Sequence, residues 1–371
     1  MSAYWSDLTR RLVPYVPGEQ PRDRKFVKLN TNENPYPPSP LVIEAIQKAA
    51  ADTLRLYPDP ACTELREAVA SRYGIKTEQV FTGNGSDEIL AFAFAAFFDR
   101  AALREIESGS VKDAILFPDI TYSFYPVYAG LWGIAYRIIP LGEDFSMDTR
   151  PYLDISGGII FPNPNAPTGM AISLEEVRKI AEAAKRNRRA LIVDEAYIAF
   201  ADGEGVATAL SLIGEFPNLL VIRTLSKEAS LAGLRAAFAM GGEELIDGLC
   251  RIRDSFNSYT LDRLALAGAA AAVNDSSYYD KINRKIIATR RRVSSGLQAM
   301  GFRVLPSQAN FVFAAPPSGK SGQGFFAALR ERGFLVRYFN KPRIENFIRI
   351  SMGTDEDMDA FLEACKEILR I

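Results

Sequence analysis

The chain has 371 residues, 48% hydrophobic and 24% charged, and its 44 basic and 45 acidic side chains leave a net charge of −1. This composition suits a globular protein with a sizeable core, and the balanced charge excludes a general attraction for nucleic acid or for an anionic membrane. Histidine is absent, which excludes Ser–His and Cys–His catalytic pairs and histidine metal ligands; an acid–base group must then be Lys, Asp, Glu, Tyr or Cys.

Residues 1–40 are predicted to form an N-terminal arm, because closely spaced prolines between positions 35 and 40 oppose regular structure. The first residues contain no apolar run, so we expect no signal peptide. The most apolar stretches, 89–98 and 264–273, are shorter than the ~20 residues of a membrane-spanning helix. The three cysteines, Cys62, Cys250 and Cys365, form no Cys-x-x-Cys motif, so we expect a reducing cytoplasm, no disulfide framework and no metal site.

Residues 41–245 are predicted to form a large α/β domain. Short apolar strands alternate with helices, a pattern typical of a mostly parallel sheet that is covered on both faces. The expected helices cover 41–51, 64–73, 85–98 and 174–186, and the expected strands lie within 80–84, 113–119, 133–141, 157–164, 190–197, 218–226 and 236–241.

The rest of the chain is predicted to contain an interdomain helical segment, 246–290, and a small C-terminal α+β domain, 291–371. In the small domain, 301–314 and 347–353 contain strand-like runs, a helix is expected near 324–332, and another helix closes the chain.

Polar residues follow the predicted strands of the large domain, at the sheet edge where parallel α/β proteins bind ligands. Each motif alone has an ordinary reading as a helix cap, a core tyrosine or a surface lysine. The segment 83–87 is no dinucleotide fingerprint, because Glu88 stands where its last glycine would be, but a helix N-terminus there favours an anion. In chain order the polar groups are Gly83 to Asp87, Thr121 and Tyr122, Asn163 and Asn165, Asp194 to Tyr197, and Thr224 to Lys227.

These motifs, taken in their order along the chain, resemble those of a known family. LIVDEAY followed by TLSKEASLAGLR is similar to the signature of fold-type I pyridoxal-phosphate aminotransferases. TNENPYPPSP, LYPDP, FTGNGSDE, FPDITYSFYP, FPNPNAPTG and FIRISMGTDEDM resemble the histidinol-phosphate aminotransferase branch, and the likeness covers nearly the whole chain. The resemblance implies a fold-type I enzyme with pyridoxal 5'-phosphate as its cofactor.

The resemblance also assigns roles to residues. Lys227 would form the internal aldimine and later move protons, Asp194 would keep the pyridine nitrogen protonated, Tyr197 would bond the ring hydroxyl, and Tyr122 would stack on the ring. The phosphate would be bound by Ser86, Thr224, Ser226 and Arg235, with helix N–H groups behind Ser86, and Gly85 and Asp87 would also belong to the cofactor site. Substrate would be bound by Tyr15, Asn32, Tyr57, Arg337 and Arg349. The family asparagine before Pro-Thr-Gly is Ala166 here, so Asn165, or else Asn163, would supply its hydrogen bond.

The implied reaction is amino transfer between L-histidinol phosphate and 2-oxoglutarate, in histidine biosynthesis, with glutamate as the second amino compound. Tyr57 and the arm resemble parts that cross between the subunits of a homodimer with shared active sites. Two alternatives share the cofactor: an aminotransferase for aromatic or other amino acids, and an enzyme like threonine-phosphate decarboxylase. A ligand-binding regulatory module is disfavoured because no DNA-binding segment is present, and a dehydrogenase because the dinucleotide fingerprint is missing.

Overall fold

The computed structural model describes residues 3–16, 18–21, 24–100 and 113–371. A large sheet consists of β2 (Val80–Asn84), β3 (Ile115–Pro118), β4 (Tyr136–Ile139), β5 (Ile159–Pro162), β6 (Leu191–Asp194), β7 (Leu219–Thr224) and β8 (Ala236–Gly241). The strand order is β2-β8-β7-β6-β5-β3-β4, and β8 runs antiparallel to both of its neighbours while the other pairs are parallel. The predicted, mostly parallel α/β sheet is therefore confirmed.

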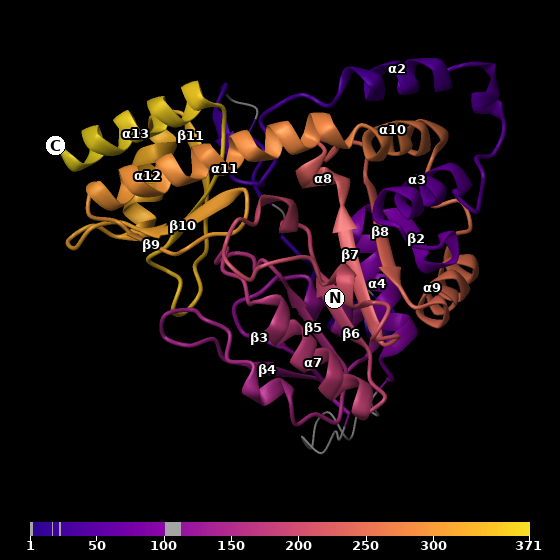
Figure 1. The fold of residues 1–371 in the computed structure, drawn as a ribbon. Helices are drawn as coiled ribbons and strands as arrows, with labels where there is room; N and C mark the ends of the chain where they lie inside the picture. The colour runs from indigo at the N-terminus through magenta and orange to yellow at the C-terminus, as the bar shows by residue number, and fades with distance from the viewer. Residues whose placement is uncertain (1–2, 17, 22–23, 101–112) are drawn as a thin grey trace.

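Helices cover both faces of the large sheet (Figure 1). Phe161 and Val193 share one apolar core with α3 (Thr63–Tyr73), α7 (Leu174–Arg186) and α10 (Arg263–Asn274). Ile160 and Ile192 share the opposite core with α4 (Gly85–Phe97), α6 (Tyr125–Trp132) and α9 (Glu243–Phe256). Successive strand residues thus point to opposite faces, which leaves the strand ends as the place where the sheet presents polar groups.

A smaller sheet forms the second unit. Its strands are β1 (Val27–Leu29), β9 (Arg303–Val304), β10 (Phe311–Ala315), β11 (Phe334–Tyr338) and β12 (Ile348–Ser351), in the order β1-β11-β12-β10-β9. It packs with α11 (Ser276–Ala299), α12 (Gly322–Glu331) and α13 (Asp355–Leu369). The remaining helices are α1 (Asp7–Arg11), α2 (Pro40–Ala49), α8 (Leu225–Glu228), η1 (Asp52–Arg55), η2 (Thr77–Gln79), η3 (Arg150–Tyr152), η4 (Ile198–Phe200) and η5 (Ala209–Leu212).

The structure differs from the prediction in two places, the N-terminal segment 1–40 and the boundary expected between residues 290 and 291. The segment 1–40 is not wholly extended: it contains α1, and β1 pairs in parallel with β11 at the edge of the small sheet. The expected boundary between 290 and 291 lies inside α11, which continues from the interdomain segment into the small unit without a break. The arm and α11 thereby join the two units.

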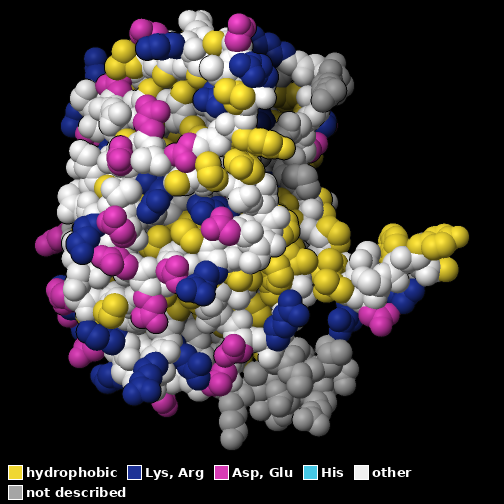
Figure 2. All heavy atoms as spheres, turned by 90° about the vertical axis from the view of Figure 1, so that its right-hand side faces the viewer, with side chains coloured by type: hydrophobic (Ala, Val, Ile, Leu, Met, Phe, Trp, Pro, Cys, Tyr) yellow, Lys and Arg dark blue, Asp and Glu magenta, His cyan; other side chains and the backbone are white. Residues whose placement is uncertain are grey.

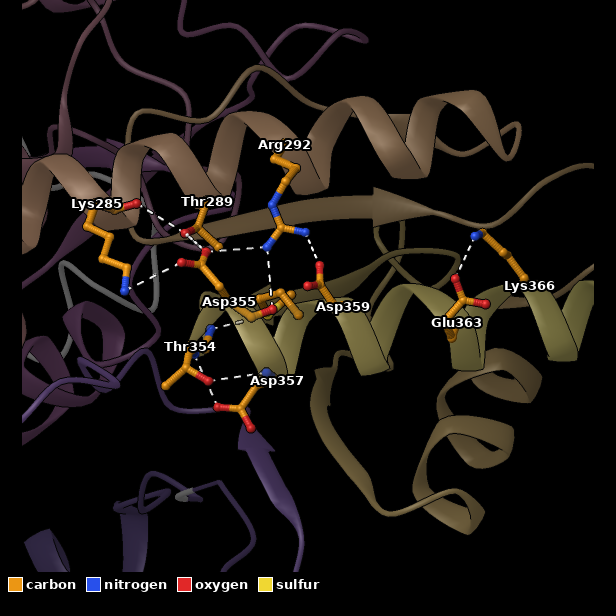
Figure 3. A network of polar contacts seen from close by, with 11 residues as sticks. Lys285, Thr289, Arg292, Thr354, Asp355, Asp357, Asp359, Glu363 and Lys366 are labelled. Carbon is orange, nitrogen blue, oxygen red and sulfur yellow. Dashed lines mark hydrogen bonds and ion pairs between the residues drawn. The ribbon is translucent and has the colours of Figure 1, made fainter.

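Polar contacts fasten α13 to α11 (Figure 3). Asp355 accepts a 2.8 Å hydrogen bond from the Thr289 hydroxyl and pairs with Lys285 Nζ at 3.4 Å. Arg292 pairs with both Asp355 and Asp359. Acidic residues in the first turn also suit the positive end of the helix dipole. Because α13 follows β12 closely, these contacts help to hold β12 in place. None of the described helices is long and apolar enough to cross a membrane.

Candidate active site

The predicted polar groups meet at the carboxyl edge of the large sheet. The Tyr122 hydroxyl donates a 2.6 Å hydrogen bond to Asp87 Oδ1, and Arg235 Nη2 lies 3.3 Å from Asp87 Oδ2. Asp87 is in the first turn of α4, Tyr122 follows β3, and Arg235 precedes β8. Asp87 and Tyr122 meet because they follow strands that end at the same edge of the sheet, whereas Arg235 reaches this edge from the amino end of the antiparallel strand β8.

Gly85 leaves space for the Arg235 guanidinium, and Ser226 is a second candidate donor for an anion. Gly85 has a left-handed backbone with φ of +77°, and a Cβ atom there would fall 2.3 Å from Arg235 Nη2. The Ser226 hydroxyl is buried and has no hydrogen-bond partner among the described residues, while its N–H donates to Thr224 Oγ1 at 3.2 Å. An unpartnered hydroxyl, a guanidinium and the N-terminus of α4 together suit a phosphate group. Gly85, Ser226, Thr224 and Arg235 thus fit the expected anion site.

Asp194, at the end of β6, is buried, and its hydrogen-bond donors among the described residues are neutral. The Tyr125 hydroxyl donates to its Oδ2 at 3.2 Å, and Ala196 N–H donates to its Oδ1 at 3.2 Å. Burial raises the pKa of this carboxyl to about 7, and the nearby negative charge of Asp87 acts in the same direction. A buried carboxyl in this setting becomes a stable anion when a cation is placed against it.

Lys227, in the short helix α8, is held between the arm and the sheet. Its Nζ donates a 2.8 Å hydrogen bond to the Thr31 carbonyl, and its own carbonyl accepts from Asn34 Nδ2 at 3.2 Å. Burial, helped by the Arg349 cation, lowers the pKa of Lys227 to about 8, against the opposing charges of Glu33 and Asp87. The amine is therefore neutral in a substantial fraction of molecules near neutral pH.

Tyr197 and Asn32, which were both predicted to belong to the site, are in contact. Asn32 Nδ2 donates to the Tyr197 hydroxyl oxygen at 2.9 Å, and the Ser351 hydroxyl donates to Asn32 Oδ1 at 2.9 Å. Burial raises the pKa of Tyr197, so the phenol stays protonated and its hydrogen remains available to a ligand. Asn32 thereby links the arm to both units of the protein.

The side chains of the two asparagines near Ala166 form hydrogen bonds within their own loop and to the neighbouring backbone. Asn165 Nδ2 donates to the Ile120 carbonyl at 3.0 Å and to Thr168 Oγ1 at 2.9 Å, although its buried Oδ1 accepts no hydrogen bond from any described residue. Asn163 exchanges hydrogen bonds with the backbone of Ile172. Both line a separate cavity of about 150 Å³, whereas Ala166 lines the main cleft. The structure therefore brings neither amide to the cleft, and a cofactor role for Asn165 stays a prediction.

A cleft of about 780 Å³ opens beside this group of residues. The arm residues 11–16, the loop after β3, Ala166, and the ends of β11 and β12 line it. The ring of Tyr15 stacks on Phe124 with centroids 4.3 Å apart. The cleft therefore combines apolar walls with cationic side chains, a composition suited to a small, partly aromatic anion.

Arg337 and Arg349 are direct neighbours across the β11–β12 pair, and both line the cleft. Arg349 Nη2 donates to the Asn30 carbonyl at 3.0 Å, and its buried Nε has no hydrogen-bond partner in the part of the chain that the structure describes. Both guanidinium groups lie near the Phe339 ring, at 5.5 and 5.6 Å from its centroid. Like charges placed opposite each other on a sheet are unfavourable, so this arrangement calls for an anion between or beside them.

Tyr57, like Asn165, is a predicted site residue that lies outside the cleft of its own chain. Its side chain is 78% exposed and stacks on Tyr259, with ring centroids 4.6 Å apart. Its carbonyl accepts a hydrogen bond from Arg263 Nη2 at 3.0 Å. A contact between Tyr57 and a substrate therefore requires a second subunit.

Three groups in this site were not predicted from the sequence. Tyr125 and Tyr128 bind the carboxylates of Asp194 and Asp87, at 3.2 and 3.4 Å, and the Thr31 carbonyl binds Lys227. The spacing of three between Tyr122, Tyr125 and Tyr128 was a readable signal, because side chains three apart share one face of a helix. No sequence signal marks a backbone carbonyl.

Comparison with known proteins identifies relatives over the whole chain. The profile of the family described as aminotransferase class I and II matches residues 24–365. A histidinol-phosphate aminotransferase of Clostridium acetobutylicum is 51% identical over 369 residues, covering 100% of both chains. Histidinol-phosphate aminotransferase 1 of Bordetella parapertussis is 51% identical over 371 residues, covering 99% of each. The crystal structure of histidinol-phosphate aminotransferase from Sinorhizobium meliloti in complex with pyridoxal-5'-phosphate superposes with a TM-score of 0.86 at 24% identity, covering 100% of this chain and 98% of that one.

Proposed function

The chain belongs to the class I and II aminotransferase family, and we propose that it is a pyridoxal-phosphate-dependent histidinol-phosphate aminotransferase. It exchanges an amino group between L-histidinol phosphate and 2-oxoglutarate, in histidine biosynthesis. The observation that carries the substrate assignment is the cross-strand pair Arg337 and Arg349 in the cleft of a chain whose full-length relatives bear that name. The fold is the α/β fold of the Sinorhizobium meliloti enzyme.

The residues at the sheet edge fit the cofactor. Ser226 and Arg235 offer donors for its phosphate, Gly85 leaves space for the Arg235 guanidinium, and Asp194 offers a buried carboxylate for its ring nitrogen. Bound pyridoxal phosphate supplies an electron sink for the bond that is broken at the substrate carbon bearing the amino group. Lys227 Nζ, with a pKa of about 8, accepts a proton from that carbon as a neutral amine and gives it up again as an ammonium. No histidine is needed for this step.

The arginine pair serves both amino compounds in turn. Histidinol phosphate carries a phosphate and no α-carboxylate, whereas glutamate carries two carboxylates. Arg349 therefore binds the phosphate of one and a carboxylate of the other, because a guanidinium presents the same planar donors to both anions. Arg337 adds the second charge, and the aromatic walls around Tyr15 and Phe339 accept the imidazole ring.

Arg337→Ala should raise the KM for histidinol phosphate on the order of tenfold to a hundredfold, since a charge-assisted hydrogen bond contributes about 1.5–3 kcal/mol. The KM for a neutral aromatic amino acid should change little, and unphosphorylated histidinol should be a poor substrate of the unmodified enzyme. Steady-state assays with 2-oxoglutarate measure all three. Arg251→Ala is the matched control, because Arg251 is exposed on α9 and pairs with Asp247.

Two other assay results would each identify a different enzyme. If phenylalanine or tyrosine has a higher kcat/KM than histidinol phosphate, the enzyme is an aromatic aminotransferase on the same scaffold. If an amino alcohol phosphate and carbon dioxide appear from a phosphorylated amino acid, it is a decarboxylase. Neither result would change the cofactor assignment.

The enzyme acts as a homodimer in the cytoplasm. Exposed apolar side chains include Trp5, Leu41, Leu54, Tyr57 and Phe256. Figure 2 shows hydrophobic side chains gathered on the side where α2, α3 and α9 lie in Figure 1. An apolar face of this kind marks a protein interface. The cysteines Cys62, Cys250 and Cys365 are free thiols, which suits a reducing compartment.

Mixing a Tyr57→Ala chain with a Lys227→Ala chain should restore part of the activity that each variant lacks. In the heterodimer, one of the two sites contains both native residues if Tyr57 reaches across to its partner. Activity of purified heterodimers, carrying two different affinity tags, measures the rescue. Heterodimers of two differently tagged Lys227→Ala chains are the control and should stay inactive. Absence of rescue, or a monomer at assay concentration, would argue against shared sites.

A further inference from the structure

Tyr125 occupies an unusual place for a tyrosine, wholly inside the protein with its hydroxyl on a carboxylate. The side chain has no exposed surface, and its hydroxyl donates to Asp194 Oδ2 at 3.2 Å. The ring is fixed by edge-on contacts with Phe117 and Tyr122, at 5.9 and 5.8 Å between centroids. Its N–H donates to the Tyr122 carbonyl at 3.2 Å, at the start of α6. The turn from Tyr122 to Tyr125 therefore places the Tyr122 hydroxyl beside Asp87 and the Tyr125 hydroxyl beside Asp194.

The bond defines how Asp194 meets a ligand. Oδ1 is engaged by the Ala196 N–H and Oδ2 by Tyr125, and no described side chain forms a salt bridge with this carboxyl. An ionised carboxylate accepts about four hydrogen bonds, so both oxygens keep a free lone pair for a cationic N–H. Donors on both sides fix the plane of the carboxylate, and a hydrogen bond to the charged form favours that form.

We propose that Tyr125 is a positioning residue for the reaction: its hydroxyl orients the Asp194 carboxylate and keeps it ionised, so that Asp194 can bind the protonated ring nitrogen of pyridoxal phosphate. This inference rests on the proposed function and adds a residue to it. The protein has no histidine for this task. A phenol performs it as a donor that does not itself titrate, because burial and the Asp194 charge hold the pKa of Tyr125 well above its ordinary value.

Several titratable groups surround the carboxyl and enter its pH response. Burial already raises the pKa of Asp194 to about 7, so the loss of one donor changes the ionised fraction of this carboxyl near neutral pH. Asp87 on α4 raises that pKa through its charge, whereas the tyrosines are neutral donors or neighbours with raised pKa values. The groups that act on Asp194, or on which Asp194 acts, are Asp87, Tyr122, Tyr125, Tyr128 and Tyr197.

Tyr125→Phe removes the hydroxyl and keeps the ring. The apoprotein is titrated with pyridoxal phosphate between about pH 6 and about pH 9, and the Kd is read from absorbance. The variant should bind on the order of tenfold more weakly near pH 7. The loss of affinity should shrink as the pH rises. Without the hydroxyl the pKa of Asp194 is higher, so the pH at which binding weakens by half also moves to a higher value. In an Asp194→Asn background, Tyr125→Phe should cause no such shift.

Tyr152→Phe is the matched control, because Tyr152 is fully buried and its hydroxyl has no partner among the described residues. It should leave the Kd and its pH dependence unchanged. Replacing Tyr125 by 3-fluorotyrosine, a stronger donor, should move the midpoint to lower pH. The titration of the 3-fluorotyrosine protein tests the role of the Tyr125 hydroxyl if the phenylalanine variant does not fold.

Three outcomes would overturn the inference: an unchanged titration in Tyr125→Phe, an equal loss in Tyr152→Phe, or a fluorotyrosine protein that titrates like the unmodified one. Failure of the unmodified apoprotein to bind pyridoxal phosphate at all would instead overturn the proposed function. The two failures are therefore distinguishable in one series of titrations.

Discussion

Lys227→Ala is expected to abolish amino transfer and the visible absorbance of lysine-linked cofactor, while the protein stays folded. Lys227 Nζ is the amine at the meeting point of the arm and the sheet, and no histidine stands in the chain to replace it as a proton carrier. Borohydride reduction followed by peptide mapping measures the covalent link. Lys179→Ala, an exposed lysine of α7, is the control and should retain both signals. A reduced cofactor–lysine adduct in the Lys227→Ala protein would contradict the assignment.

The same variant tests the lowered pKa of Lys227. Its value of about 8 in the folded protein lies below the ordinary 10.5, so between these pH values the unfolded chain binds more protons than the folded one. Stability of the unmodified apoprotein relative to Lys227→Ala should therefore rise as the pH increases from about 8 to about 10. Urea unfolding at several pH values measures this difference. A constant difference across the range would show that the lysine is not buried as described.

The sequence predicted most of the large unit, because its local signals agree with its tertiary packing. The helix expected at 174–186 is α7 with the same bounds, since Ser173 and Glu176 form a capping box at its start. The polar groups after the strands meet, because parallel strands bring their carboxyl ends to one edge. Asp87 and Tyr122 are in contact for this reason, because they follow β2 and β3. Arg235, 148 residues from Asp87, reaches the same edge from the amino end of β8, which runs antiparallel to its neighbours.

The parts that the sequence did not predict depend on long-range pairing. β1 has three residues, too few for a periodic signal, and becomes a strand by pairing with β11. Arg337 and Arg349 were expected to act together, but only the register of β11 and β12 places them opposite each other. Ala166 indicated a departure from the family pattern. The sequence could not show that Asn163 is bound to the backbone of Ile172, because that contact closes a loop of irregular structure.

Asp194→Asn should separate cofactor binding from the stability of the apoprotein. Removing one partner of a buried charge pair costs about 3–5 kcal/mol, so the variant should bind pyridoxal phosphate far more weakly and lose most of its rate. The fold should persist, because asparagine has nearly the same shape and can still bind Tyr125 and the Ala196 N–H. Cofactor titration and single-turnover kinetics measure the two losses. Near-normal activity would contradict the role of Asp194.

Stability of the apoprotein should change in the opposite sense. The pKa of Asp194 is raised from 3.8 to about 7 on folding, so between these pH values the folded state binds more protons than the unfolded state. The contribution of Asp194 to stability therefore falls as the pH rises through this window, and above pH 7 the unmodified apoprotein holds an unpaired buried anion. Asp194→Asn removes that anion. Its apoprotein should be more stable than the unmodified apoprotein at pH 8, and the difference should diminish towards pH 4, as measured by urea unfolding. Saturating pyridoxal phosphate should reverse the order at pH 8, because the ligand stabilises the protein that binds it more tightly. An apoprotein that is destabilised by the substitution at pH 8 would show that Asp194 is stabilised within the fold by something other than its cofactor.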